Sequence, residues 1–147
     1  MRSNCTRSFR HALAATTLVT VAWALASCAK PAPPGDLKVG EITTGRTLAA
    51  DGSIVEDART TMFWSTDTFY ASVVTDGSAD NVTLAAHWIG PDGKLAAESK
   101  KTLSPKGTTI TSFEAPPPSG GWPDGDYKVE ILVNGAIEGT RDLNARH

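Results

Sequence analysis

The sequence predicts an all-β domain, an antiparallel sandwich of seven or eight strands that follows a cleaved signal helix. Short runs rich in β-branched and aromatic residues recur along the chain, and apolar and polar residues alternate within them. Clusters of Gly, Asp, Asn and Pro separate these runs at short intervals. No convincing helical pattern follows the leader, so a two-sheet architecture is the expected way to bury the apolar faces.

Length, composition and charge limit what the domain does. The chain has 147 residues, and removal of the first 27 leaves 120, enough for one domain with one core. Arg2, Arg7 and Arg10 all lie in the leader, so the remainder carries eleven basic and sixteen acidic residues and a formal charge of −5. Because an acidic domain binds polyanions poorly, we expect no nucleic-acid partner.

Residues 1–27 have the composition of a secretory signal peptide. Residues 1–11 carry arginines and no acidic residue, and residues 12–26 are mostly apolar and small. This apolar run is shorter than the roughly 20 residues that a membrane-spanning helix needs. It ends in Leu25-Ala26-Ser27-Cys28, which resembles the bacterial lipobox, where the chain is cut before a cysteine that carries lipid. An ordinary signal peptide cut elsewhere and an uncleaved anchor are the alternatives.

The resemblance to bacterial lipoproteins implies that Cys28 becomes the mature N-terminus with diacylglycerol on its sulfur. Two acyl chains anchor a protein stably where one does not. Ala29 is not an inner-membrane retention signal by the sorting pattern of Gram-negative lipoproteins, which implies an outer-membrane location facing the periplasm in such a cell. Residues 28–36 are rich in proline, which predicts an extended tether of roughly 20 Å.

Residues 37–147 are expected to form the sandwich. Asn134-Gly135 is the strongest hairpin signal in the chain. Lys100 and Lys101 give one strand the protection typical of a sheet edge. The alternation places Trp88, Val73 and Tyr127 between the sheets or at their rims. The expected strands lie at residues 37–48, 54–64, 69–75, 82–88, 94–103, 108–113, 127–133 and 136–143.

Residues 121–131, with the pattern G-x-Y-x-V-x-I, resemble the strand that closes many bacterial immunoglobulin-like and fibronectin-like modules. Residues 69–73 fit the same layout, and so do residues 86–88 followed by Asp92-Gly93. The resemblance covers residues 37–143 and implies the fold alone, since this fold hosts many functions. The mature chain has no Cys-Trp-Cys set, which excludes an antibody-type domain.

No arrangement typical of catalysis occurs in the domain, and we expect no enzyme, no cofactor and no metal site. His87 is expected to be a half-exposed strand residue, and no His, Asp and Glu cluster has the spacing of metal ligands. No G-x-S-x-G motif and no phosphate-binding glycine loop is present. Asp124 and Asp126 are expected to bond nearby backbone N–H groups, with acid–base catalysis as the alternative.

The candidate binding residues are aromatic and acidic side chains at loop ends. If successive strands alternate in direction, the turns at residues 65–67, 90–93 and 116–124 share one end of the sandwich. Aromatics with polar neighbours at loop ends commonly bind partners. In the alternative, Trp122 caps the core and Trp64 covers a sheet edge. The candidates are Trp64, Asp67, Asp92, Trp122 and Asp124.

By the same count of strands, residue 37 begins at this end, so the tether is expected to hold the candidate surface toward the membrane. The expected function is therefore a lipid-anchored module that binds another envelope protein or stabilises an envelope complex. A small-ligand or glycan-binding module that uses the loop-end aromatics is the alternative. An enzyme is the third hypothesis.

Overall fold

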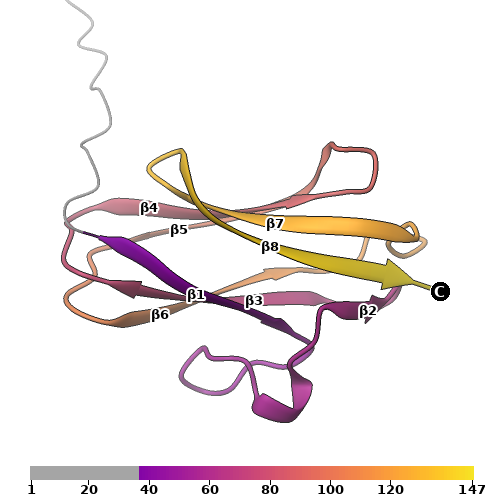
Figure 1. Ribbon diagram of the computed structural model, residues 1–147, viewed down its shortest axis with the longest axis horizontal. Coiled ribbons are helices and arrows are strands. Elements are labelled where there is room, and N and C mark those ends of the chain that lie inside the picture. Colours follow the sequence, from indigo (N-terminus) through magenta and orange to yellow (C-terminus); the bar gives the residue numbers. More distant parts are fainter. Residues whose placement is uncertain (1–36) are drawn as a thin grey trace, which may run out of the picture. The chain divides into compact units, whose positions relative to one another are not determined.

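The computed structural model describes residues 37–147, which form eight strands in two sheets (Figure 1). The first sheet has the order β1-β3-β6 and the second has the order β2-β8-β7-β4-β5. All pairs are antiparallel except β2 with β8, which is parallel. The expected all-β sandwich is confirmed. The strands are β1 (Lys38–Gly45), β2 (Met62–Trp64), β3 (Phe69–Asp76), β4 (Val82–Ile89), β5 (Leu95–Leu103), β6 (Thr109–Ala115), β7 (Gly125–Val133) and β8 (Ala136–Arg146).

The strand order is that of an immunoglobulin-like sandwich. In that fold one sheet contains strands A, B and E, and the other contains G, F, C and often C′. Here β1, β3 and β6 take the first three positions, and β8, β7, β4 and β5 take the other four. Trp88 on β4 is fully buried, at the strand where immunoglobulin domains bury a tryptophan. The Tyr127 hydroxyl, near the start of β7, donates to the Pro123 carbonyl at 2.9 Å, which forms a tyrosine corner.

The core lies between the two sheets and follows the predicted alternation. On β4 the inward positions are Val82, Leu84, Ala86 and Trp88, and all four are at most 1% exposed. On β7, inward side chains from Tyr127 to Val133 are buried in the same alternating pattern. The indole N–H of Trp88 has no hydrogen-bond partner among the described residues, so Trp88 contributes through apolar packing alone.

The strand expected over residues 54–64 is wrong. Only residues 62–64 form a strand, and a 3₁₀ turn, η1 (Glu56–Ala58), occupies the middle of the segment. The Asp51-Gly52 turn is closed by one isolated bridge, between Leu48 and Ile54. Figure 1 shows this segment as a loop outside β1 and β3 rather than as part of a sheet. It stays there because Ile54 is buried at 3% exposure and the Ala58 carbonyl accepts the Arg46 N–H at 3.0 Å.

The loss of this strand corrects the expected position of residue 37. Because residues 46–61 do not form a returning strand, β1 and β2 run in the same direction along the sandwich. Lys38 pairs with Asp76 at the end of β3, whereas Gly45 pairs with Tyr70 at its start. Leu37 therefore lies at the end of the sandwich opposite the turn between β2 and β3.

The predicted hairpin and the predicted edge strand are both confirmed. Asn134 and Gly135 both have positive φ, at 49° and 87°, and form the two-residue turn between β7 and β8. Strand β5, with Lys100 and Lys101, lies at an edge of the five-stranded sheet as expected. Among the described residues, no helix is long and apolar enough to cross a membrane.

Candidate functional site

Three turns share one end of the sandwich, as predicted, and we call it the three-turn end. The turns are residues 65–68, 90–94 and 116–124. The Trp122 backbone N–H donates to the Ser65 carbonyl at 2.8 Å, and its indole N–H donates to the Asp67 carbonyl at 2.9 Å. The second and third turns also meet closely, since a Cβ on Gly125 would lie 2.7 Å from the Cβ of Pro91.

An aromatic cluster lies directly beneath this end. Phe69 is fully buried and stacks face to face on Trp122, with ring centroids 4.4 Å apart and an interplanar angle of 11°. Tyr127 packs edge-on against both rings, at centroid distances of 5.5 and 5.8 Å. Phe63 and Trp88 complete the cluster around Phe69, at 4.7 and 5.8 Å. Trp122 is 2% exposed, so it caps the core, as the alternative interpretation held.

Trp64 differs from Trp122 in being an exposed aromatic. Its side chain is 58% exposed, and Met62, two residues earlier on β2, is 55% exposed. Phe63 between them is buried at 2% exposure, so Met62 and Trp64 lie together on the outer face of the five-stranded sheet. Strand β2 is the edge of this sheet, so the two side chains form a small apolar patch there.

Asp67 holds the turn and the edge of β2 in place. Its Oδ2 accepts hydrogen bonds from Arg46 Nε at 2.7 Å and from the Trp64 backbone N–H at 2.8 Å. The Arg46 guanidinium also donates to the Met62 carbonyl at 2.5 Å and lies 5.7 Å from the Phe63 ring centroid. This carboxylate is thus a structural acceptor that presents Trp64, rather than a free ligand group.

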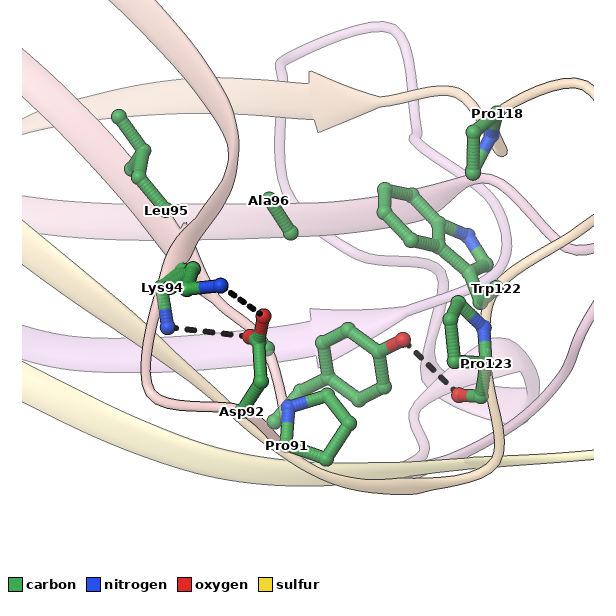
Figure 2. A pocket seen from close by; sticks show the side chains of 10 residues that line it. Pro91, Asp92, Lys94, Leu95, Ala96, Pro118, Trp122 and Pro123 are labelled. Atoms are coloured by element: carbon green, nitrogen blue, oxygen red, sulfur yellow. Dashed lines mark hydrogen bonds and ion pairs between the residues drawn. The ribbon is translucent and has the colours of Figure 1, made fainter.

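Asp92 lies beside a mostly apolar hollow at the three-turn end (Figure 2). A cavity of about 420 Å³ separates the turn at residues 90–94 from residues 118–123. Figure 2 shows the Asp92 carboxylate turned toward Lys94, whose backbone N–H donates to it at 3.1 Å and whose Nζ lies 3.6 Å away. The cavity is lined by Gly90, Pro91, Asp92, Lys94, Leu95, Ala96, Pro118, Trp122, Pro123 and Tyr127.

Asp124 and Asp126 were expected to bond nearby backbone N–H groups. Asp124 does accept a hydrogen bond from the backbone N–H of His147, and the other partners of the two carboxylates are side chains of the C-terminal segment. Asp124 Oδ1 lies 2.6 Å from His147 Nδ1, and this hydrogen bond holds the pKa of the Asp124 carboxyl below its usual value. Asp126 accepts a hydrogen bond from Asn144 Nδ2 at 2.7 Å. The two carboxylates therefore help to fasten the end of the chain to the start of β7.

His87 is half-buried on β4, as expected, and its Nε2 lies 3.3 Å from Glu98 Oε1. Glu98 also pairs with Lys100 at 2.6 Å, and the Lys100 ammonium is the main reason that the pKa of this carboxyl is lowered. Within residues 37–147, no three His, Cys, Asp or Glu side chains gather as metal ligands would.

The structure therefore brings four of the five candidate residues together and leaves Asp124 with a different partner. Asp67 connects Trp64 to Trp122, and Asp92 shares the cavity with Trp122, whereas Asp124 pairs with His147. Arg46 was not a candidate, because it lies 21 residues from Asp67 and no local pattern links the two.

No protein-family model matches the chain, and no curated protein does. Solved structures resemble it at a distance. An immunoglobulin-like protein from Pseudomonas aeruginosa is 12% identical, with a TM-score of 0.48 over 78% of this chain and all of that one. A CARDB domain from Pyrococcus furiosus, in complex with di-metal ions, is 15% identical, with a TM-score of 0.46 over 76% of this chain and 89% of that one.

A third match is a Pseudomonas fluorescens alkylpurine DNA glycosylase bound to DNA, which is 14% identical with a TM-score of 0.48. It covers 76% of this chain, but this chain spans only 30% of the glycosylase. Likeness at this level indicates no function, and the fold assignment rests on the strand order, Trp88 and Tyr127.

Replacement of Tyr127 by Phe tests the corner that closes this end. Loss of the hydrogen bond to Pro123 is expected to lower the free energy of unfolding by about 1 kcal/mol at neutral pH. Burial, with help from the carboxylates of Asp92 and Asp124, raises the pKa of Tyr127. The phenol's contribution is therefore fully present below pH of about 10 and is lost as the pH rises through the folded-state pKa.

Urea unfolding of the wild type and of Tyr127→Phe between pH 7 and 11 measures this difference. We expect the gap in unfolding free energy to narrow above pH of about 10, because the unfolded wild-type chain ionises first. A gap that stays constant across this range would show that the phenol is not held neutral by its surroundings.

Proposed function

We propose that the protein is a lipid-anchored, non-catalytic binding module of the cell envelope, and that its three-turn end engages another envelope protein. Cys28 and the tether of residues 28–36 lie outside the described residues, so the anchor is proposed from the lipobox resemblance alone. The binding role is supported by one observation above the others. Trp64 and Met62 are more than half exposed, and Asp67 and Arg46 hold the backbone that presents them.

The position of Leu37 indicates which way the proposed surface faces relative to the anchor. The first described residue lies at the end of the sandwich opposite the three-turn end, so a tether that precedes it leaves Trp64 on the side away from the anchor. Strands of eight residues span about 26 Å at about 3.3 Å per residue. When the expected tether of roughly 20 Å is added, the proposed surface lies some tens of ångströms from the lipid. We therefore propose a partner that lies away from the lipid headgroups. The count of strands from the sequence had instead led us to expect this surface to face the membrane.

The second candidate function is binding of a small apolar ligand in the cavity beside Asp92. Its volume of about 420 Å³ falls within the range of small-molecule pockets. A glycan is a poor match for this cavity, because sugars stack on open aromatic faces and Trp122 is only 2% exposed. The ligand would instead contact Leu95 and the proline rings. A ligand-induced rise in melting temperature that depends on Leu95 would favour this function.

Replacement of Cys28 by Ser tests the anchor. We expect the variant to lose both incorporation of labelled palmitate and sedimentation with membranes, because serine cannot form the thioether. Cys5→Ser is the matched control, and it should keep label and membrane association. A Cys28→Ser protein that is still labelled and still sediments with membranes would contradict the lipobox interpretation.

Replacement of Trp64 by Ala tests the binding surface. Cross-linking of intact cells that express the full chain should give fewer adducts with envelope proteins for Trp64→Ala, by about tenfold if Trp64 is a hot spot. Ile137→Ala is the matched control, since Ile137 is 55% exposed but lies beside the β7–β8 turn at the other end. Both variants should fold, because the side chains are on the surface. An unchanged set of adducts for Trp64→Ala would remove the three-turn end as the site.

A further inference from the structure

The two sheets present four edge strands, and three of them are blocked against further pairing. On β2, Arg46 and Asp67 occupy the outward carbonyl of Met62 and the outward N–H of Trp64. On β1, a register shift between Val39 and Ile42 interrupts the edge. On β5, Lys101 pairs with the buried Leu84, and its side chain extends toward Phe113 of the other sheet, so a charge lies on the inner side of this edge. Bulges, covered backbone groups and inward charges are the usual means by which edge strands avoid new partners.

The fourth edge, β6, has none of these features. Its register against β3 is unbroken from Thr109 to Ala115, and its sequence, Thr-Ile-Thr-Ser-Phe-Glu-Ala, contains no lysine and no proline. In immunoglobulin domains a further strand, D, pairs with this edge. Among the described residues nothing pairs with β6 on this side.

The ladder shows which backbone groups face the open edge. The Gly107 N–H donates to the Gly77 carbonyl, and this pair is in the same register as the pairs between β3 and β6. In an antiparallel ladder every second residue bonds to the neighbouring strand, so the odd-numbered residues of β6 bond to β3. Ile110, Ser112 and Glu114 therefore direct their N–H and C=O groups outward. None of these groups has a hydrogen-bond partner within residues 37–147.

A groove runs along this edge. Two hollows of about 660 and 190 Å³ lie side by side, and both are lined by Lys101 and Ser112. Together they follow β6 from Thr109 to Glu114, with β5 as one wall and residues 48–52 as the other. The second wall is close, since a Cβ on Gly52 would lie 3.6 Å from the Ser112 hydroxyl. A segment of six extended residues, about 20 Å long, matches this edge.

We propose that β6 is a peptide-binding edge, which takes one extended segment of another polypeptide as a fourth strand of the three-stranded sheet. Main-chain hydrogen bonds to Ile110, Ser112 and Glu114 supply the affinity, as in other cases of strand addition. We choose an extended segment as the occupant, rather than a second folded copy, because β5 and residues 48–52 flank the edge on both sides. This surface is separate from the three-turn end, and the inference does not depend on the anchor.

Lys101 determines the chemistry of the segment. Its Nζ lies 5.8 Å from the Phe113 ring centroid, and it forms no ion pair with another described residue. A strand added to β6 passes beside this ammonium, so the segment carries an acidic side chain at the position facing Lys101. Its other residues are β-branched or apolar, and proline is absent where an N–H must reach β6.

The test is a displayed library of random dodecapeptides, selected on the full chain in detergent. We expect the enriched peptides to share an acidic residue within a β-branched stretch free of proline. The best peptide, made synthetically with a fluorescent label, is titrated against wild-type protein and two variants. Ser112→Pro removes an outward N–H, and proline is tolerated at such edge positions. It should weaken binding at least tenfold, and Lys101→Ala should weaken it several-fold, less so at high salt.

Lys100→Pro is the matched control. The Asn134 N–H donates to the Thr83 carbonyl, so odd-numbered residues of β4 bond to β7 and even-numbered residues bond to β5. The Lys100 N–H therefore faces away from β4, on the outer side of the edge strand β5. This variant should bind within about twofold of wild type. Loss of binding by Lys100→Pro with Ser112→Pro unaffected would overturn the proposal, and so would a library that yields no peptide.

Hydrogen exchange gives a second measurement that needs no variant. With the peptide bound, the amide protons of Ile110, Ser112 and Glu114 should exchange at least tenfold more slowly, and that of Lys100 should not change. Protection that appears at the three-turn end, with none on β6, would also overturn the proposal.

Discussion

The stacking of Phe69 on Trp122 is the interaction on which the three-turn end depends. Phe69 begins β3, and Trp122 belongs to the long loop between β6 and β7, so their contact fastens that loop to the first sheet. Once its ring is fixed, Trp122 can donate both of its N–H groups to the turn at residues 65–68. One aromatic pair thus joins two turns that lie far apart in the sequence, and Tyr127 closes the corner beside them.

Because most of the aromatic side chains pack in the core, they are not available to contact a partner. Phe63, Phe69, Trp88, Trp122 and Tyr127 are all buried, and packing of the core accounts for them. Among the exposed large apolar side chains, Trp64 and Met62 lie two residues apart on the edge strand β2. Polar groups near this pair are already bonded to the protein. The binding that we propose at the three-turn end therefore depends on apolar contact, whereas the binding that we propose at β6 depends on unpaired backbone groups.

Local patterns predicted those parts of the fold that local physics determines. Alternation in residues 82–88 and 127–133 identified the buried faces of β4 and β7, because a pleated strand with one buried face has a period of two. The Asn134-Gly135 hairpin and the edge position of β5 were likewise confirmed. The strand predicted over residues 54–64 was wrong because Ile54 and Val55 suit a strand, yet no neighbouring strand is available to pair with them. This one error reversed the end of the sandwich to which Leu37 was assigned.

The roles of the candidate residues were less predictable, because they too depend on contacts between residues that are distant in the sequence. Trp64 and Trp122 both lie beside turns, and only tertiary contact with Phe69 separates the buried one from the exposed one. The role of Asp67 depends on Arg46, and that of Asp124 depends on His147, each more than 20 residues away.

Amide and indole hydrogen exchange in Phe69→Leu tests the central claim directly. If the stack fastens the three-turn end, the Trp122 indole N–H will exchange at least tenfold faster than in wild type, while the Asn134 N–H at the other end changes only with global stability. Equal acceleration at both positions would contradict the account.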